Sequence, residues 1–157
     1  ALAALWRIVR SGRLIASGEF VRGETPVVSW TAVPLSEISS LRTYRSHLGR
    51  WDFEPYGICI RRAWLEDQGA RPVQYGDEAT WDALPRDDRP FFQKRESHTA
   101  SGKRIDWTVE REWRHAGDVE LGELPADAAL LFVPSDAEAR QLAAASPWPI
   151  VVLPGGC

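Results

Sequence analysis

The stretch WTVEREWR, residues 107–114, constrains the fold more than any other part of the sequence. In a β-strand, successive side chains point to opposite faces of the sheet. Two carboxylates two residues apart then lie about 7 Å apart along the backbone, where like charges raise a pKa unless a cation intervenes. Such a row is either a solvated face with an ordinary ion pair or an acidic functional site. As a strand, the stretch would place Trp107, Val109, Arg111 and Trp113 on one face, and Thr108, Glu110, Glu112 and the candidate cation Arg114 on the other.

The remaining sequence alternates short helical patterns with β-branched and apolar runs. Residues 42–55 favour a solvated helix and loop, residues 94–105 a mobile loop, and residues 118–121 a continuation or partner of the strand at 107–114. The order of elements predicts the α+β class, with a mixed, largely antiparallel sheet and short helices. We expect helices over residues 1–11, 35–41 and 61–69 and after Ser135, and strands over residues 27–31, 56–60, 72–75, 129–133 and 149–153.

Length and composition indicate one domain over residues 1–157, with its N-terminal start missing because the chain opens inside a helix without Met. The net charge of -3 gives no global basic field for nucleic acid or membrane, and no apolar run is long enough to cross a bilayer. Cys59 and Cys157 form no disulfide framework, which favours the cytoplasm. The three histidines are scattered, so we expect no metal site.

Two of the expected strands carry polar residues in a pattern that resembles ADP-ribosyltransferase domains. Ser29-Trp30-Thr31 is similar to the Ser-x-Ser-like motif of the second strand in those domains, and Glu110-Arg111-Glu112 is similar to the later Glu-x-Glu motif. Residues 4–14 resemble the helix and turn between the first two strands. The first strand, which carries an Arg or His, would lie upstream of Ala1.

This resemblance implies an ADP-ribosyltransferase-like fold that uses NAD and no metal. By the resemblance, Glu112 would stabilise the ribose oxocarbenium ion and Glu110 would orient or deprotonate the acceptor. Ser29 and Thr31 would position the nicotinamide ribose. In such an enzyme, Tyr56 or a tryptophan would stack on the nicotinamide. By charge alone, Arg45, or alternatively Arg42 or Arg50, would hold the pyrophosphate.

The order of several short motifs over residues 26–135 is similar to bacterial abortive-infection proteins of the AbiGi type. The most specific of these motifs is Glu-x-Glu-Trp-Arg at residues 110–114. This second resemblance implies a phage-defence or toxin–antitoxin protein. Combined with the first, it implies transfer of ADP-ribose from NAD to a macromolecular acceptor.

Two other classes of function fit the sequence. Residues 42–53 are rich in Arg and aromatic side chains, which dominate interface hot spots, and indicate a non-catalytic antitoxin or interaction module for a protein or nucleic-acid partner. A nuclease would instead use Glu110 and Glu112, with Asp106, to hold a divalent ion.

Overall fold

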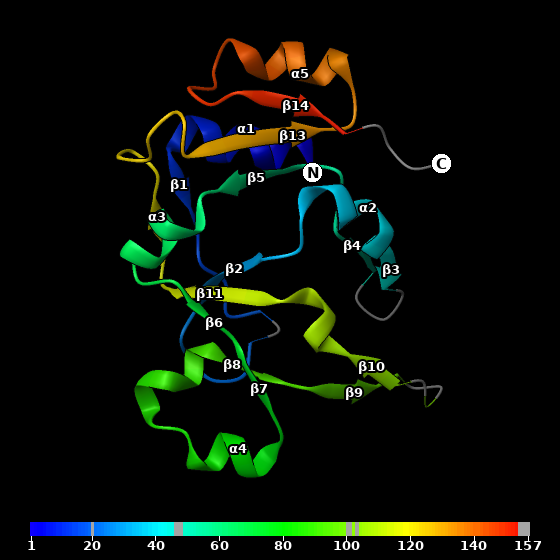
Figure 1. Ribbon diagram of the computed structural model, residues 1–157, viewed down its shortest axis with the longest axis vertical. Coiled ribbons are helices and arrows are strands. Elements are labelled where there is room, and N and C mark those ends of the chain that lie inside the picture. Colours follow the sequence, from blue (N-terminus) through cyan, green and yellow to red (C-terminus); the bar gives the residue numbers. More distant parts are fainter. Residues whose placement is uncertain (20, 46–48, 100–101, 103, 154–157) are drawn as a thin grey trace. The chain divides into compact units, whose positions relative to one another are not determined.

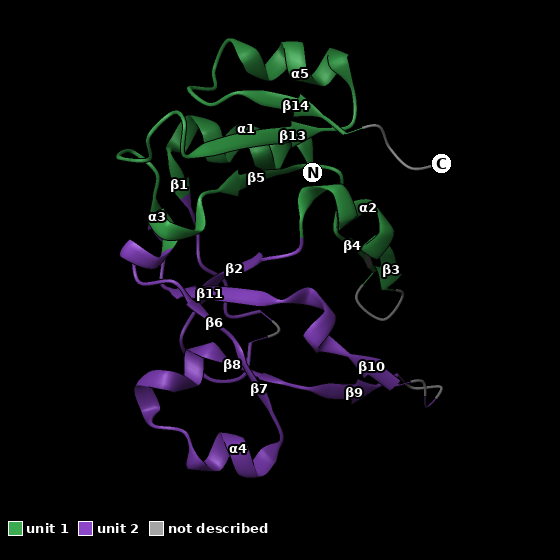
Figure 2. Ribbon diagram, viewed as in Figure 1, with its two compact units in different colours: residues 1–13, 34–65, 120–157 green, residues 14–33, 66–119 purple. Residues whose placement is uncertain are grey.

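A computed structural model describes residues 1–19, 21–45, 49–99, 102 and 104–153 of the chain. Helices and strands alternate, and strand pairing is mostly antiparallel, which confirms the predicted α+β class. The strands form several small sheets, where the sequence predicted a single sheet. The chain divides into two compact units, with residues 1–13, 34–65 and 120–157 in unit 1 and residues 14–33 and 66–119 in unit 2 (Figure 2). The prediction of a single domain stays a prediction.

Unit 1 contains a three-stranded sheet in the order β14 (Ile150–Val152), β13 (Ala129–Val133), β5 (Gly57–Ile60) (Figure 1). β13 pairs parallel with β14 and antiparallel with β5. The helix α5 (Asp136–Ala143) connects the two parallel strands and packs against both. The helix α1 (Leu2–Ser11) belongs to the same unit and buries Leu5 and Val9.

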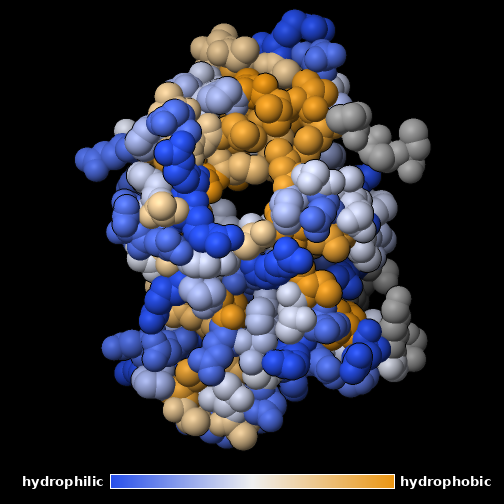
Figure 3. Space-filling model, viewed as in Figure 1, coloured by the Kyte–Doolittle hydropathy of each residue, from blue (hydrophilic) through white to orange (hydrophobic). Residues whose placement is uncertain are grey.

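The core of unit 1 is apolar, as the sequence of β13 predicts. Leu131, Val133 and Leu142 are completely shielded from solvent. Hydrophobic side chains also gather over β13 and β14 on the face shown in Figure 3. The other elements of unit 1 are short: η1 (Leu35–Glu37), α2 (Ile38–Leu41), β3 (Thr43–Arg45), β4 (Arg50–Asp52) and most of α3 (Arg62–Asp67).

Unit 2 is built on an antiparallel sheet in the order β2 (Val27–Thr31), β11 (Glu112–Ala116), β6 (Arg71–Pro72). A second, parallel pair joins β7 (Gln74–Gly76) to β8 (Phe92–Lys94). The predicted strand at 72–75 is therefore divided between two sheets. The division follows buried Val73, whose N–H donates to the Glu112 carbonyl before the chain turns to β7.

The rest of unit 2 consists of short helices and a hairpin around these sheets. The elements are α4 (Glu78–Ala83), η2 (Arg86–Phe91), β9 (Glu96–His98), β10 (Arg104–Asp106) and η3 (Trp107–Glu110). β1 (Arg13–Leu14) pairs with β12 (Val119–Glu120), so residues 118–121 do not pair with β11 as the sequence suggested.

The helix ends agree with their sequence signals. Gly12 adopts a left-handed conformation, φ 62°, and ends α1 with a hydrogen bond from its N–H to the Ile8 carbonyl. Ser135 caps α5, and its hydroxyl accepts from the Glu138 N–H at 3.3 Å. Among the described residues, no helix is long and apolar enough to cross a bilayer.

Two segments predicted as loops or helix are hairpins instead. Residues 94–105, expected as a mobile loop, contribute to the antiparallel pair β9–β10, and residues 42–55 contain the antiparallel pair β3–β4. Cross-strand contacts stabilise both hairpins: Arg104 binds Glu96 at 3.1 Å, and Arg45 binds Asp52 at 2.6 Å. Both hairpins pair residues that lie within ten positions of each other, but the polar composition of these segments gave no alternating strand pattern.

Cys59 lies half-buried in β5 as a free thiol, and burial raises its pKa. This fits the expectation of a small apolar residue in a strand. Cys157 lies outside the described residues.

Candidate functional site

The two strands that carry the predicted motifs are neighbours in the sheet of unit 2. β2 and β11 pair antiparallel, with Thr31 opposite Glu112 and Ser29 opposite Arg114. The structure therefore brings the Ser-x-Thr segment next to the second of the two glutamates. Ser29 is exposed and Thr31 is half-buried.

The predicted strand at 107–114 is wrong in its first half. Glu110 ends the 3-10 helix η3, and Arg111 follows it in the left-handed conformation with φ 46°, so Glu110 and Glu112 do not share a strand face. Asp106 starts the helix by accepting hydrogen bonds from the N–H and hydroxyl of Thr108, at 3.0 and 2.7 Å. A short polar side chain that accepts from a backbone N–H two residues later favours a turn over a strand. The same hydrogen bonds lower the pKa of Asp106.

Contacts with β2 hold this turn in place. The Thr31 hydroxyl donates to the Glu110 carbonyl at 2.5 Å and accepts from the Val33 N–H at 3.1 Å. The Ala32 N–H donates to the Arg111 carbonyl at 3.0 Å. Thr31 therefore stabilises the backbone of the acidic segment, which is a structural use of its side chain.

Glu112 and Arg114 form a bidentate ion pair on one face of β11. Nε and Nη2 of Arg114 donate to the two carboxylate oxygens of Glu112 at 2.8 and 2.9 Å. The side chain of Arg114 is 3% exposed and that of Glu112 is 11% exposed. The sequence correctly predicted Arg114 as the neighbouring cation.

All the N–H groups of the Arg114 side chain are used. Besides Glu112, the guanidinium donates to the carbonyls of Pro90 and Phe92, at 3.2 and 2.7 Å, and to the Gln93 side chain at 2.8 Å. This cation ties β11 to the end of η2 and the start of β8. Each oxygen of the Glu112 carboxylate accepts a hydrogen bond from Arg114, so this guanidinium neutralises the charge of Glu112.

Tyr75 is a residue of this cluster that the sequence did not single out. Its hydroxyl accepts from the Glu112 N–H at 2.9 Å. Burial raises the pKa of Tyr75, and the charges of Glu112 and Glu110 raise it further against the lowering effect of that N–H. Only the separate strand β7 brings Tyr75 here, so no signal in the sequence around it predicts the contact.

The other two predicted NAD-binding residues belong to unit 1, where each has a partner. The Tyr56 hydroxyl donates to Glu138 at 2.7 Å, and this hydrogen bond raises the pKa of Tyr56. Arg45 pairs with Asp52 at 2.6 Å, with both side chains less than one-fifth exposed. Among the described residues, no group of three or more His, Cys, Asp or Glu side chains is placed to hold a metal ion.

The Arg/aromatic segment 42–53 forms a second candidate site on the β3–β4 hairpin of unit 1. Tyr44 and Trp51 are opposite each other in register, with ring centroids 5.3 Å apart, and are 52% and 43% exposed. The guanidinium carbon of Arg42 lies 4.3 Å from the centroid of Trp51 and also approaches Glu54 at 3.7 Å. Residues 46–48 of this segment lie outside the described residues.

No known protein family, curated protein or solved structure shows a significant match to the chain.

Proposed function

We propose that the protein is a non-catalytic interaction module that binds a partner protein through the exposed face of the β3–β4 hairpin. The observation that carries this proposal is the exposed ring pair of Tyr44 and Trp51, with Arg42 stacked on the indole. Aromatic and Arg side chains dominate binding hot spots because they bury a large area with few rotatable bonds. The rings are held in place before binding, which lowers the entropic cost of association.

The charges of the hairpin favour a protein over a nucleic acid. Binding to phosphates depends on cations that release counterions, and an arginine already paired with a carboxylate supplies little of this. Arg42 is paired with Glu54 and Arg45 with Asp52. The complementary surface is therefore an apolar pocket for the rings with a polar rim.

Site-specific cross-linking tests the proposal. A photoreactive amino acid in place of Tyr44 should trap the partner in the native cells, and the purified partner is then titrated calorimetrically. Trp51→Ser should weaken binding about thirtyfold or more, because truncating a hot-spot aromatic costs roughly 2 kcal/mol or more. Val109→Ser is the matched control, since Val109 is 51% exposed and belongs to unit 2.

Equal affinities of Trp51→Ser and Val109→Ser for the partner would contradict the proposal. Titration with fluorescent single-stranded RNA and DNA tests whether the hairpin binds nucleic acid instead of a protein. Tight, strongly salt-dependent binding that Trp51→Ser abolishes would reassign the hairpin to nucleic acid.

Transfer of ADP-ribose from NAD, in phage defence or a toxin–antitoxin pair, is the second candidate. Its support is the adjacency of Ser29 and Thr31 on β2 to Glu112 on β11. The ion pair between Glu112 and Arg114 weighs against it. A labelled-NAD transfer assay on the wild type and on Glu110→Gln tests this candidate, because Glu110 can be changed without breaking that ion pair. The cytoplasmic location stays a prediction.

A further inference from the structure

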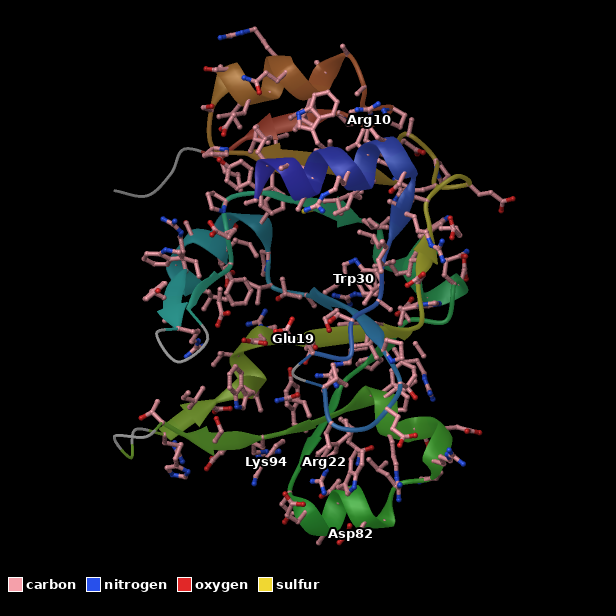
Figure 4. All side chains as sticks on the ribbon, turned by 180° about the vertical axis from the view of Figure 1, so that it is seen from behind. Arg10, Glu19, Arg22, Trp30, Asp82 and Lys94 are labelled. Carbon is pink, nitrogen blue, oxygen red and sulfur yellow. The ribbon has the colours of Figure 1, made fainter. Side chains whose placement is uncertain are left out.

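A cleft of about 450 Å³ lies in unit 2, and neither Glu112 nor Arg114 is among the residues that line it. The loop after β1, the helix α4 and the 3-10 helix η2 form its walls. Three arginines, Arg22, Arg86 and Arg89, line it against a single carboxylate, Glu24. Figure 4 shows Arg22 beside α4.

Trp81 of α4 organises the cations of this cleft. The guanidinium carbons of Arg22 and Arg89 lie 4.3 and 5.1 Å from the centroid of its ring. The half-buried indole packs edge-to-face with the buried ring of Phe92, with centroids 5.4 Å apart, which anchors it to the core. Two like charges on one ring repel each other, and an anion between them would relieve that repulsion.

The partners of the three arginines differ. Arg22 forms an ion pair with Glu78 at 2.5 Å, and Glu78 forms a second ion pair with Lys94 at 3.4 Å. In the described part of the chain, Arg86 and Arg89 have no carboxylate partner. Asp88, which lies between them in sequence, is paired with Arg71 at 2.9 Å.

Arg89 carries the most specific indication that this cleft binds a ligand. Its Nε is buried and has no hydrogen-bond partner, although the side chain as a whole is half-buried. Buried N–H groups of a charged side chain are nearly always satisfied, so this unpartnered group, on a residue that lines the cleft, favours an acceptor supplied by a ligand.

We propose that this cleft binds the phosphate group of a small phosphorylated molecule, held by Arg86 and Arg89 with Arg22 beside them. Guanidinium groups present paired N–H donors that match phosphate oxygens, and this geometry distinguishes phosphate from a diffuse anion. The volume of the cleft lies in the range of small-molecule sites. The ligand is therefore a nucleotide, a sugar phosphate or inorganic phosphate, and its phosphate is the recognised group.

Titration of the full chain with phosphate compounds tests the proposal. Inorganic phosphate, pyrophosphate, AMP and glucose phosphate are each added to the wild type, with citrate and sulfate as competing anions. Calorimetry and phosphorus NMR should detect one site for at least one phosphate compound, and the tightest probe identifies the molecule that carries the phosphate. Equal affinity for citrate and sulfate would overturn the assignment to phosphate.

The variants Arg86→Gln and Arg89→Gln locate the site. Each should weaken binding about tenfold or more, because each removes a charge-assisted hydrogen bond. Arg89→Lys keeps the charge but not the Nε donor, and it should fall between Arg89→Gln and the wild type. Arg10→Gln is the matched control, since it removes one positive charge from an exposed position on α1 in unit 1.

Circular dichroism and Tm confirm that each variant is folded before its affinity is compared. Absence of binding by every phosphate compound at millimolar concentration would overturn the proposal, as would an equal loss in Arg10→Gln. Binding to a single-stranded oligonucleotide, lost in Arg89→Gln and without binding of the small compounds, would also overturn it in favour of nucleic acid.

Discussion

Replacing Glu112 with Gln should destabilise unit 2, because it leaves the buried guanidinium of Arg114 without its counter-charge. Arg114 is 2% exposed as a residue, and two of its five hydrogen bonds go to the Glu112 carboxylate. Gln keeps the volume of Glu and one oxygen acceptor, but it places an NH₂ group against a second donor of Arg114.

Removing one partner of a buried ion pair costs about 3–5 kcal/mol, and the retained acceptor puts Glu112→Gln near 3 kcal/mol. That loss is a large part of the roughly 5–15 kcal/mol by which a domain is stable. For a chain of this size it corresponds to a decrease in Tm of about 6–12 °C. Urea unfolding followed by tryptophan fluorescence, together with calorimetry, measures both quantities.

Glu96→Gln is the matched control for Glu112→Gln. Its ion pair with Arg104 is 39% and 64% exposed, so its loss should change stability by less than about 1 kcal/mol. A Glu112→Gln variant within about 0.5 kcal/mol of the wild type would refute the reasoning, since the carboxylate would then not compensate the buried cation. The same variant is a poor test of NAD chemistry, because a loss of activity would not separate a catalytic role of Glu112 from its role in stabilising unit 2.

Two further predictions concern packing and pH. Gly57→Ala should destabilise unit 1 by about 1–3 kcal/mol, since a Cβ at Gly57 would lie 2.5 Å from the ring of Phe132; thermal unfolding should show no such loss for Gly122→Ala, where nothing lies within 4 Å. Tyr75→Phe should cost about 1–3 kcal/mol by removing the acceptor for the Glu112 N–H. Because the folded protein raises the pKa of Tyr75 above its ordinary value of 10.0, the wild type should lose stability as the pH rises past that value, and urea titrations across this range should show a smaller loss in the variant.

Features with a local cause were predictable from the sequence. Gly12 ends α1 because only glycine adopts a left-handed conformation without strain, and Ser135 starts α5 because its hydroxyl binds a free N–H group. The apolar run at 129–133 predicts a buried strand because a continuous apolar run suits a strand that is covered on both faces. The structure confirms this prediction in β13.

Features that depend on distant residues were decided only by the tertiary structure. The sequence predicted that Glu112 forms a carboxylate pair with Glu110, but in the structure Arg114 neutralises its charge. Arg114 in turn donates to carbonyls about twenty residues away along the chain. Arg22 lies more than fifty residues from Arg86 and Arg89, yet all three line one cleft, where Trp81 contacts Arg22 and Arg89. A sequence determines the propensity of each segment and the chemistry of each side chain. Which charges are neutralised, and which remain available to a ligand, depends on burial and on contacts that exist only after the chain has folded.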